Sequence, residues 1–251
     1  MIAKYFFLSS LCLFGYSYLN PRSPSALSEY TFMDQLAVEA GTAKSSLYHD
    51  YMRVYSKYFA SLRNQPIKFL EIGILHGQSV QFWERYFPKG TLHFIDSSFD
   101  RIDYFSTRST YHLADQANAL DLRKVMKDSG GDFNIIIDDG GHVANQQITS
   151  FLELFPHVKS GGMYIIEDLH TSYWKNYGGS DAGSAESPIP GEKSAITFLQ
   201  GLIHDLNFVG ARTGIADHRK LSPELKASLS YTKAHIDSMH FYDSLCIILK
   251  K

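Results

Sequence analysis

Five short apolar runs, beginning at residue 67, alternate with segments whose apolar residues recur at helical spacing. The runs are IKFLEI (67–72), TLHFID (91–96), TYHLA (110–114), FNIIID (133–138) and GMYIIE (162–167). The helical segments cover residues 78–87, 118–128 and 143–156. Nearly continuous apolar runs separated by helices are typical of βαβ units, in which a parallel sheet is buried on both faces. Such an open α/β sheet binds its ligands at the carboxyl ends of the strands.

The last part of the chain predicts a different kind of strand connection. Two β-like runs, at 234–241 and 244–250, are separated only by Tyr242–Asp243. So short a link can join antiparallel strands but not parallel ones. The predicted fold class is therefore α/β and Rossmann-like: a mostly parallel sheet with a C-terminal antiparallel hairpin and helices on both faces.

Three further segments complete the predicted order of elements. Residues 46–63 carry an aromatic stripe at helical spacing, which indicates an amphipathic helix packed on the core. Residues 175–191 are rich in Gly, Ser and Pro and predict a long loop. Long loops inside compact domains often serve as lids, so we expect this one to close over a ligand. A helix is expected near 193–206.

The N-terminal residues differ in character from the rest of the chain. Residues 5–19 form an apolar run that is shorter than the ~20 residues needed to cross a bilayer. Its shape is closer to the core of a signal peptide, with a tail or an N-terminal helix as the alternative. We therefore separate residues 1–26, a signal, anchor or tail, from a single predicted domain at 27–251. Any membrane contact is expected only through residues 5–19.

Charge and cysteine content narrow the choice of partners. The formal net charge is −2, from 24 basic and 26 acidic residues, and no basic stripe suited to nucleic-acid phosphates is present. The two cysteines, Cys12 and Cys246, form neither a disulfide framework nor a metal-binding spacing. Nucleic acid is therefore not an expected partner, and a small molecule is.

The first strand is followed by a glycine-containing turn that suits a ligand with a positive group. The segment FLEIGILHGQS contains Glu71, Gly73, Gly77 and Ser79. Its Gly-x-x-x-Gly spacing matches neither the dinucleotide fingerprint nor the phosphate-binding P-loop. A carboxylate ahead of the first glycine would repel a pyrophosphate, but it suits the amino group of S-adenosylmethionine. The alternative is a tight strand–helix turn that needs glycine in any case.

Polar residues also follow the second and third strands. Asp96 ends the second strand, near the offset from the first glycine at which an acidic residue usually binds ribose hydroxyls. Asp115 and Gln116 follow the third strand and are placed to contact an adenine edge. Helix capping and turn formation are the alternatives for the two aspartates. Polar groups at three successive strand ends favour a pocket for S-adenosylmethionine, the methyl donor.

The fourth and fifth strands each end in a pair of carboxylates. Asp138 and Asp139 follow III (135–137), while Glu167 and Asp168 follow MYII (163–166). In a parallel sheet both pairs emerge at the same edge, where they would repel one another unless a cation lay between them. Hard oxygen ligands favour Mg²⁺ or a similar divalent ion. We assign Asp138 to the site for S-adenosylmethionine. The alternative to a metal site is that Asp139 and Asp168 cap helices and that Glu167 pairs with an unidentified base.

Two histidines lie just beyond the carboxylate pairs. His142 follows Asp139 across a Gly-Gly turn, and His170 follows Asp168. An imidazole can remove the proton of a hydroxyl group because its pKa lies near neutrality. Base chemistry alone allows either histidine.

Taken together, these motifs resemble a known enzyme family. The matching segments are GTAKSSLYHDYMRVYSKYF, FLEIGILHGQS, IDDGGH, SGGMYIIEDLHTSYW and HFYDSLCIILK. They are similar to the class I S-adenosylmethionine-dependent methyltransferases of the macrocin and mycinamicin type, which methylate sugar hydroxyls of macrolides, and the likeness covers residues 41–251. The resemblance implies the methyltransferase variant of the Rossmann fold.

The resemblance also implies roles for individual residues. Asp139, Glu167 and Asp168 would hold magnesium, and His142, rather than His170, would act as the base. Residues from Glu71 to Gln116 would contact the donor. Tyr173 and Trp174 would line the acceptor pocket.

The sequence thus predicts a metal-dependent O-methyltransferase that acts on a hydroxyl of a sugar, a glycoside or another small molecule. A catechol-type O-methyltransferase remains an alternative, because adjacent phenolic hydroxyls would chelate the same ion. A non-catalytic donor-binding module is a second alternative, against which the intact carboxylates and His142 count. A cytoplasmic location is favoured because the methyl donor is made in the cytosol. A homo-oligomer is compatible with the sequence, which does not identify the acceptor.

Overall fold

The structure is a computed structural model that describes residues 26–180, 182–183, 188–214 and 221–251. The predicted apolar segment at 5–19 lies outside the described residues. Among the residues that the structure describes, no helix is long and apolar enough to cross a membrane.

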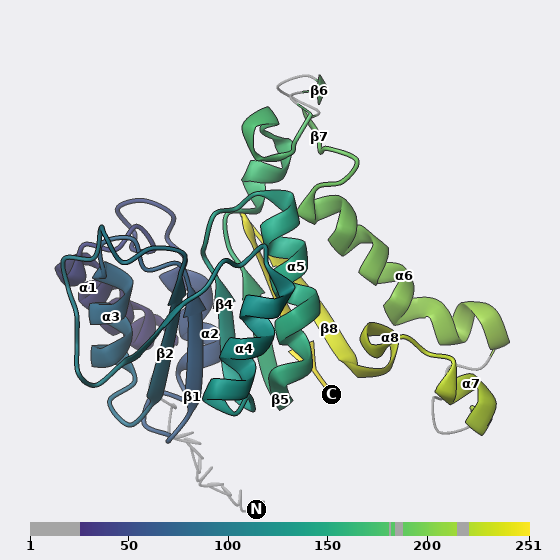
Figure 1. The fold of residues 1–251 in the computed structure, drawn as a ribbon, viewed down its shortest axis with the longest axis horizontal. Helices are drawn as coiled ribbons and strands as arrows, with labels where there is room; N and C mark the ends of the chain where they lie inside the picture. The colour runs from purple at the N-terminus through teal and green to yellow at the C-terminus, as the bar shows by residue number, and fades with distance from the viewer. Residues whose placement is uncertain (1–25, 181, 184–187, 215–220) are drawn as a thin grey trace, which may run out of the picture.

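A seven-stranded sheet forms the centre of the molecule (Figure 1), with strand order β3-β2-β1-β4-β5-β9-β8. The strands are β1 (Lys68–Ile72), β2 (Thr91–Asp96), β3 (Thr110–Leu113), β4 (Phe133–Asp138), β5 (Val158–Ile166), β8 (Ile236–Tyr242) and β9 (Leu245–Lys250). The first five strands pair in parallel, whereas β9 pairs antiparallel with both β5 and β8. This arrangement confirms the predicted fold class. The hairpin turn lies at residues 243–244, one position later than predicted.

Successive residues of the central strands enter different cores because side chains alternate across a sheet. Phe69, Ile135 and Ile165 pack on one face under the helices α1 to α3. Leu70 and Ile136 pack on the other face with α4 to α6. The helices are α1 (Ala26–Ala40), α2 (Met52–Phe59), α3 (Gln78–Tyr86), α4 (Ala119–Ser129), α5 (Ala144–Leu154) and α6 (Ala195–Thr213). The strands are apolar on both faces because both faces are covered.

Local sequence signals fix where the helices on this scaffold begin and end. The Asn118 side chain caps α4 by accepting a hydrogen bond from the Leu120 amide, and Gly130 ends that helix in the left-handed conformation. Caps of this kind each stabilise a helix by about 1 kcal/mol. At the start of α5 the Gln146 side chain accepts from the Val143 amide. The N-termini of both helices therefore lie next to the loops that follow β3 and β4.

The crossover from one half of the sheet to the other creates the binding crevice. The chain proceeds from the central β1 outward to β3, then returns to β4 on the other side of β1. Ligands of open α/β sheets bind at this switch point, beyond the carboxyl ends of the strands. Gly73 lies there with φ +95°, and a Cβ atom at this position would overlap the Asp139 carbonyl group. Only glycine allows the loops after β1 and β4 to approach so closely.

Several predicted elements differ in extent. The helix predicted at 46–63 is only α2, because residues 41–51 form turns, and Asp50 has φ +52°. Strand β5 begins before the predicted residue 162, and α6 extends beyond the predicted residue 206. Helix α1, whose residues Met33, Leu36, Ala37 and Ala40 are buried, was not predicted.

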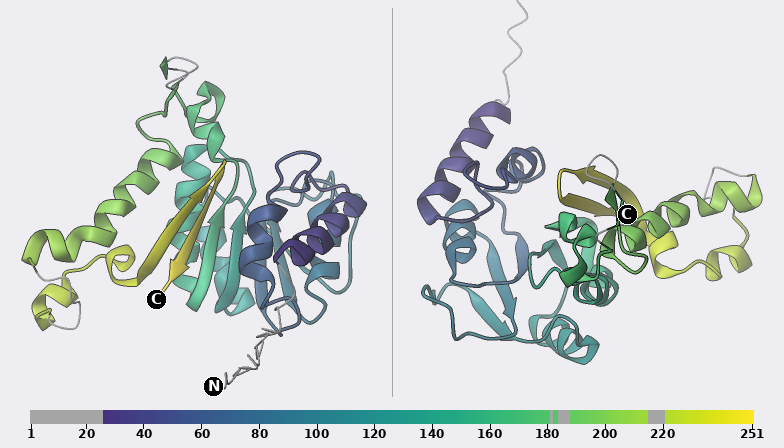
Figure 2. Two further views of the ribbon diagram at one scale, coloured as in Figure 1. Left: turned by 180° about the vertical axis from the view of Figure 1, so that it is seen from behind. Right: turned by 90° about the horizontal axis from the view of Figure 1, so that it is seen from above.

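The segment predicted as a long loop contains some regular structure. It includes the 3₁₀ turn η3 (Lys175–Tyr177) and the two short strands β6 (Ala182–Gly183) and β7 (Pro188–Ile189). Beyond it, α6 leads away from the sheet to α7 (Pro223–Ala227), and the chain returns through α8 (Tyr231–His235) (Figure 2). This arm lies on the side of the molecule opposite α1 and α3.

Candidate functional site

A cavity of about 780 Å³ opens at the carboxyl ends of β1, β2 and β4. Five of the eight residues predicted to bind the donor line it: Gly73, Ser79, Asp96, Asp115 and Gln116. The other three, Glu71, Gly77 and Asp138, are not among its lining residues. Asp139, His142 and Asp168 line the same cavity. Five predicted donor residues therefore share one cavity with Asp139 and Asp168, two of the three predicted metal ligands.

Asp96 connects two loops at the floor of this cavity. Its Oδ2 accepts hydrogen bonds from the amides of Ile74 (2.8 Å) and Leu75 (3.3 Å), and its Oδ1 accepts from the Ser98 amide (3.1 Å). Asp115 Oδ1 accepts from the Ala117 amide at 2.8 Å, which is the turn role considered as its alternative. Both carboxylates are thus held by backbone amides on the wall of the cavity.

Asp138 forms a buried network with Gln116, which also lines the cavity. Gln116 Nε2 donates to Asp138 Oδ1 at 3.0 Å, and Gln116 Oε1 accepts from the Gly141 amide at 2.6 Å. The hydroxyl of Tyr164 donates to Asp138 Oδ2 at 3.3 Å. Burial raises the pKa of the Asp138 carboxyl. This network fixes the loop that carries Asp139 and His142.

Two overlapping groups of acidic and imidazole side chains meet at the end of the cavity. His142 Nε2 lies 3.3 Å from Asp168 Oδ2 and 3.9 Å from Asp139 Oδ1. Among the described residues, Asp139, His142 and Asp168 offer ligand atoms within 4.8 Å of one another, as do Glu71, Asp139 and Glu167. The predicted set of Asp139, Glu167 and Asp168 is not such a group, because Glu167 faces the second cluster. Asp139 is common to both groups.

Tyrosine hydroxyls hold two of these carboxylates. Tyr51 donates to Asp168 Oδ1 at 2.5 Å, and Tyr55 donates to Glu167 Oε1. Burial alone would raise the pKa of Asp168, but the Tyr51 hydrogen bond and the nearby histidines outweigh it, so this pKa lies below its usual value. Burial raises the pKa of Glu167, and the charge of Asp139 raises it further. Tyr51 and Tyr55 belong to the aromatic stripe that the sequence assigned to packing.

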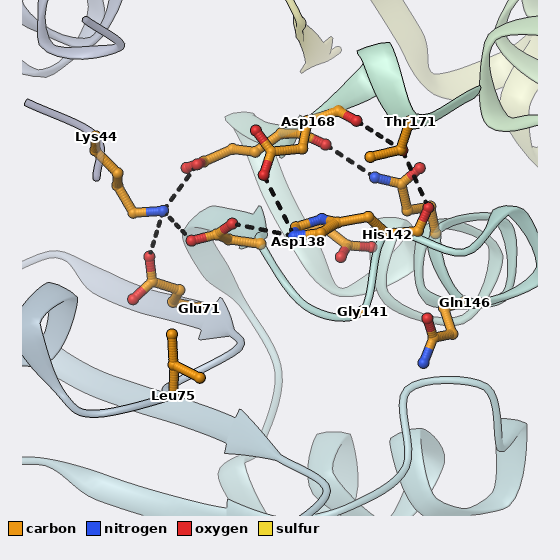
Figure 3. Close-up of polar contacts among 12 residues, drawn as sticks. Lys44, Glu71, Leu75, Asp138, Gly141, His142, Gln146, Asp168 and Thr171 are labelled. Atoms are coloured by element: carbon orange, nitrogen blue, oxygen red, sulfur yellow. Dashed lines mark hydrogen bonds and ion pairs between the residues drawn. The ribbon is translucent and has the colours of Figure 1, made fainter. Parts of the chain in front are cut away.

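Lys44 is the residue at this site that the sequence did not predict. It lies in the turns after α1 with only 2% of its surface exposed. Its ammonium group bonds to Asp139 Oδ2, to Glu167 Oε2 (2.8 Å) and to Glu71 Oε1 (3.3 Å), as Figure 3 shows. Burial disfavours the charged form, but the three carboxylates outweigh it and raise the pKa of Lys44 well above its ordinary value. The sequence left open, as an alternative to a metal site, that Glu167 pairs with an unidentified base. Lys44 is that base.

Glu71 occupies a different environment from the one predicted for it. It is fully buried, accepts a hydrogen bond from Trp83 Nε1 at 3.0 Å and pairs with Lys44. Burial raises its pKa. Its carboxylate therefore contacts the lysine and not the wall of the donor cavity.

Two residues of the site adopt the left-handed backbone conformation. His142 has φ +57° and Asp168 has φ +54°, values that side chains rarely adopt. Neither Asp139 nor Asp168 makes a side-chain cap, since α5 begins after Val143 and the 3₁₀ helix η2 (Leu169–Tyr173) starts without one. Strain of this kind is often found at functional sites.

His170 lies outside the cavity that His142 lines. Its Nδ1 is 2.9 Å from the Ser244 hydroxyl, and its ring packs edge-on against Trp174 with centroids 4.7 Å apart. Trp174 is 49% exposed and does not line the cavity, and neither does Tyr173. Of the two histidines, only His142 therefore reaches the cavity and its carboxylates.

Comparison with known proteins supports a methyltransferase relationship. The chain is 33% identical to an 8-demethyl-8-(2-methoxy-alpha-L-rhamnosyl)-tetracenomycin-C 3'-O-methyltransferase of Streptomyces olivaceus, over 87% of the chain and 53% of the relative. It is 32% identical, with the same coverage, to the demethylmacrocin O-methyltransferase of Streptomyces fradiae. The MycE methyltransferase in complex with Mg and SAH matches with a TM-score of 0.72 and 28% identity, over 87% of the chain and 53% of that structure. By sequence and by fold, the chain is a relative of sugar O-methyltransferases.

These matches confirm the resemblance inferred from the motifs. The chain spans about half the length of the curated relatives it matches. No family model matches it.

Proposed function

We propose that the chain transfers a methyl group from S-adenosylmethionine to a hydroxyl of a sugar or glycoside, in a reaction that needs a divalent metal ion. One observation carries this proposal. Asp139, His142 and Asp168 meet in a cavity that is also lined by the loops after β1, β2 and β3, which the sequence predicted to bind the methyl donor. The names of the relatives, which are sugar O-methyltransferases, support the choice of acceptor.

The cavity suits the donor in size and in the placement of its polar groups. A volume of about 780 Å³ lies within the usual range of small-molecule pockets. When bound, S-adenosylmethionine supplies an electrophilic methyl group on a sulfonium centre. Asp96 is positioned to accept hydrogen bonds from ribose hydroxyls, and Gly73 leaves room for the ligand beside the backbone. The carboxylates at the end of the cavity favour a cationic ligand.

The carboxylates of the predicted metal site are suitable ligands for a hard divalent cation. Asp139, Glu167 and Asp168 contribute carboxylate oxygens, and the lysine that contacts two of them compensates only one negative charge. We propose that these three residues would hold magnesium. When bound, the ion makes a coordinated hydroxyl easier to deprotonate. The hydrogen bonds from Tyr51 and Tyr55 keep two of the carboxylates oriented.

His142 is the proposed base. Its Nε2 lies 3.3 Å from Asp168 Oδ2 at the cavity. Asp168, itself held by Tyr51, fixes the direction of the ring. His142 would take the proton of the acceptor hydroxyl while the oxygen bonds to the methyl carbon and the carbon–sulfur bond breaks, releasing S-adenosylhomocysteine.

Calorimetric titration with S-adenosylhomocysteine, with and without Mg²⁺, tests the donor part of the proposal. We expect micromolar binding, about −8 kcal/mol. A folded protein that binds none would overturn the proposal. With S-adenosylmethionine and p-nitrophenyl glycosides or catechols as acceptors, EDTA should abolish methyl transfer. Turnover that persists with EDTA would remove the metal, and turnover of catechols alone would replace the sugar acceptor.

A further inference from the structure

Lys44 contacts more carboxylates than its single charge can balance. Its buried ammonium group lies among Glu71, Asp139 and Glu167. The Glu71 and Glu167 side chains are 0% and 1% exposed, and that of Asp139 is 26% exposed. With all four groups ionised, the cluster carries an excess of two negative charges. A single divalent cation would neutralise that excess.

Lys44 also occupies oxygens that a metal ion would need. It bonds to Asp139 Oδ2 and Glu167 Oε2, and both residues belong to the proposed ligand set. The other oxygen of Glu167 accepts the hydrogen bond from Tyr55, so both of its oxygens already have a partner. A metal ion that binds Glu167 must therefore displace the ammonium group or lie close beside it.

Two positive charges that share carboxylates oppose each other. Their repulsion grows as the effective dielectric constant falls, so it is stronger at this buried site than in water. The same lysine keeps the carboxylates together in the absence of metal, since removing one partner from a buried charge cluster is strongly destabilising. Lys44 thus stabilises the metal-free protein and weakens metal binding through the same contacts.

We propose that Lys44 is a resident cation that preserves the carboxylate cluster without metal and competes with the divalent ion for Asp139 and Glu167. This inference rests on the proposed function in one respect, the use of these carboxylates as metal ligands. Lys44 is a positioning residue: it acts on the site through the carboxylates. Its role is to keep the site assembled while leaving the ion exchangeable.

The test compares Lys44→Met with the wild-type protein. Methionine is unbranched, similar in length and uncharged. Calorimetric titration with MgCl₂ should show binding about tenfold tighter or more in the variant, because the competing charge is gone. In EDTA the variant should melt at a lower temperature than the wild type, and Mg²⁺ should raise its Tm by more than it raises that of the wild type.

Lys250 provides a matched control. It is also buried, but its ammonium group donates to the carbonyl oxygens of Phe155, Pro156 and Val158. Lys250→Met should lower the Tm equally in EDTA and in Mg²⁺ and leave the affinity for Mg²⁺ unchanged. Lys44→Arg, which keeps the charge, should not show tighter binding. If Lys44→Met folds only with Mg²⁺, that supports the proposal; if it folds under neither condition, Lys44→Gln replaces it in the same titration.

The outcomes separate this inference from the proposed function. Wild-type protein that binds Mg²⁺, together with a folded Lys44→Met variant that binds it equally or more weakly, would overturn the role of Lys44 alone. Absence of Mg²⁺ binding in both proteins would overturn the competition and the metal requirement together. Titration with S-adenosylhomocysteine on the same samples reports the donor site independently.

Discussion

The amino and carboxyl ends of the parallel strands, called here the amino and carboxyl edges of the sheet, surround lysine side chains with different groups. At the amino edge, Lys68 Nζ donates to the carbonyls of Ser129 (2.5 Å) and Gly131 (2.6 Å), and Lys250 Nζ donates to those of Pro156 (2.8 Å) and Val158 (2.5 Å). At the carboxyl edge, carboxylates gather around the single ammonium group of Lys44. Carbonyl groups therefore surround the ammonium groups of Lys68 and Lys250, whereas carboxylates in excess surround that of Lys44.

The direction of the helices explains this difference. Helices of a βαβ unit run antiparallel to the strands, so their C-termini, with unpaired carbonyls and a partial negative charge, lie at the amino edge. Lys68 binds just beyond the end of α4, and Lys250 binds at the 3₁₀ turn η1 (Phe155–His157) that follows α5. Both lysines therefore donate to carbonyl groups that the helix ends leave without a partner. The carboxyl edge retains an excess of charge and is therefore the edge that can bind a cationic ligand.

The largest predicted effect is on catalysis at the carboxyl edge. Asp139→Asn should lower kcat by about a hundredfold or more, the scale of losing a directly acting group, because it neutralises the carboxylate common to both clusters. Its Tm should change little or rise, since the site carries excess negative charge. Steady-state kinetics and a melting curve measure both effects. Asp128→Asn, an exposed aspartate on α4, is the control; equal losses in the two variants would contradict the prediction.

The next effect separates donor binding from metal chemistry on the same edge. Asp96→Ala should weaken S-adenosylhomocysteine binding by about a hundredfold, corresponding to the loss of hydrogen bonds to a charged group. Asp115→Ala should weaken it less, because Asp115 is exposed and already forms a turn with the Ala117 amide. Calorimetry on both variants makes the comparison. Equal losses of affinity would mean that Asp96 and Asp115 contribute equally to binding S-adenosylhomocysteine.

At the amino edge the prediction concerns stability alone. Lys250→Met should lower the free energy of unfolding by about 2–4 kcal/mol, because it leaves buried carbonyls without a donor. Activity of the folded fraction should be unchanged. Urea unfolding and kinetics on the same preparation test this; a selective loss of kcat would contradict the division between the edges.

The smallest effect concerns the interior of the sheet, between the two edges. Burial and the neighbouring His112, 3.1 Å away, lower the pKa of His93 to about 4. Because the folded protein resists protonation at His93, the unfolded chain binds the extra proton between about pH 6.5 and 4, and stability falls as the pH falls through that range. His93→Gln should remove about 1–2 kcal/mol of this loss. Urea unfolding at pH 7, 5.5 and 4.5 measures the free energy of unfolding of both proteins. The same dependence on pH in the wild type and the variant would contradict the prediction.

The sequence predicted the features that local pattern determines. The parallel strands are continuous apolar runs, and the polar residues that end them reach one edge, as the cavity lining of Asp96, Gln116 and Asp139 shows. Helix α1 was missed although Met33, Leu36, Ala37 and Ala40 follow helical spacing, because the exposed apolar residues Phe32 and Val38 weaken the contrast between its two faces.

Contacts between distant parts of the chain were not predictable in the same way. Lys44 lies 95 residues from Asp139 and 123 from Glu167, and nothing around it in GTAKSS signals burial. Glu71 was assigned to the donor because a strand-end carboxylate does not reveal which way it points. The structure directs it toward Lys44 instead.

The position of β9 has a consequence for how the protein is made. β9 lies between β5 and β8, and the turn before it contacts the segment after Asp168: Leu169 donates to the Ser244 carbonyl at 2.9 Å. During synthesis β5 therefore emerges from the ribosome well before the strand that covers its edge. Unpaired strand edges promote aggregation. The nascent chain must protect β5 until residues 245–250 arrive, and the site takes its final form only then.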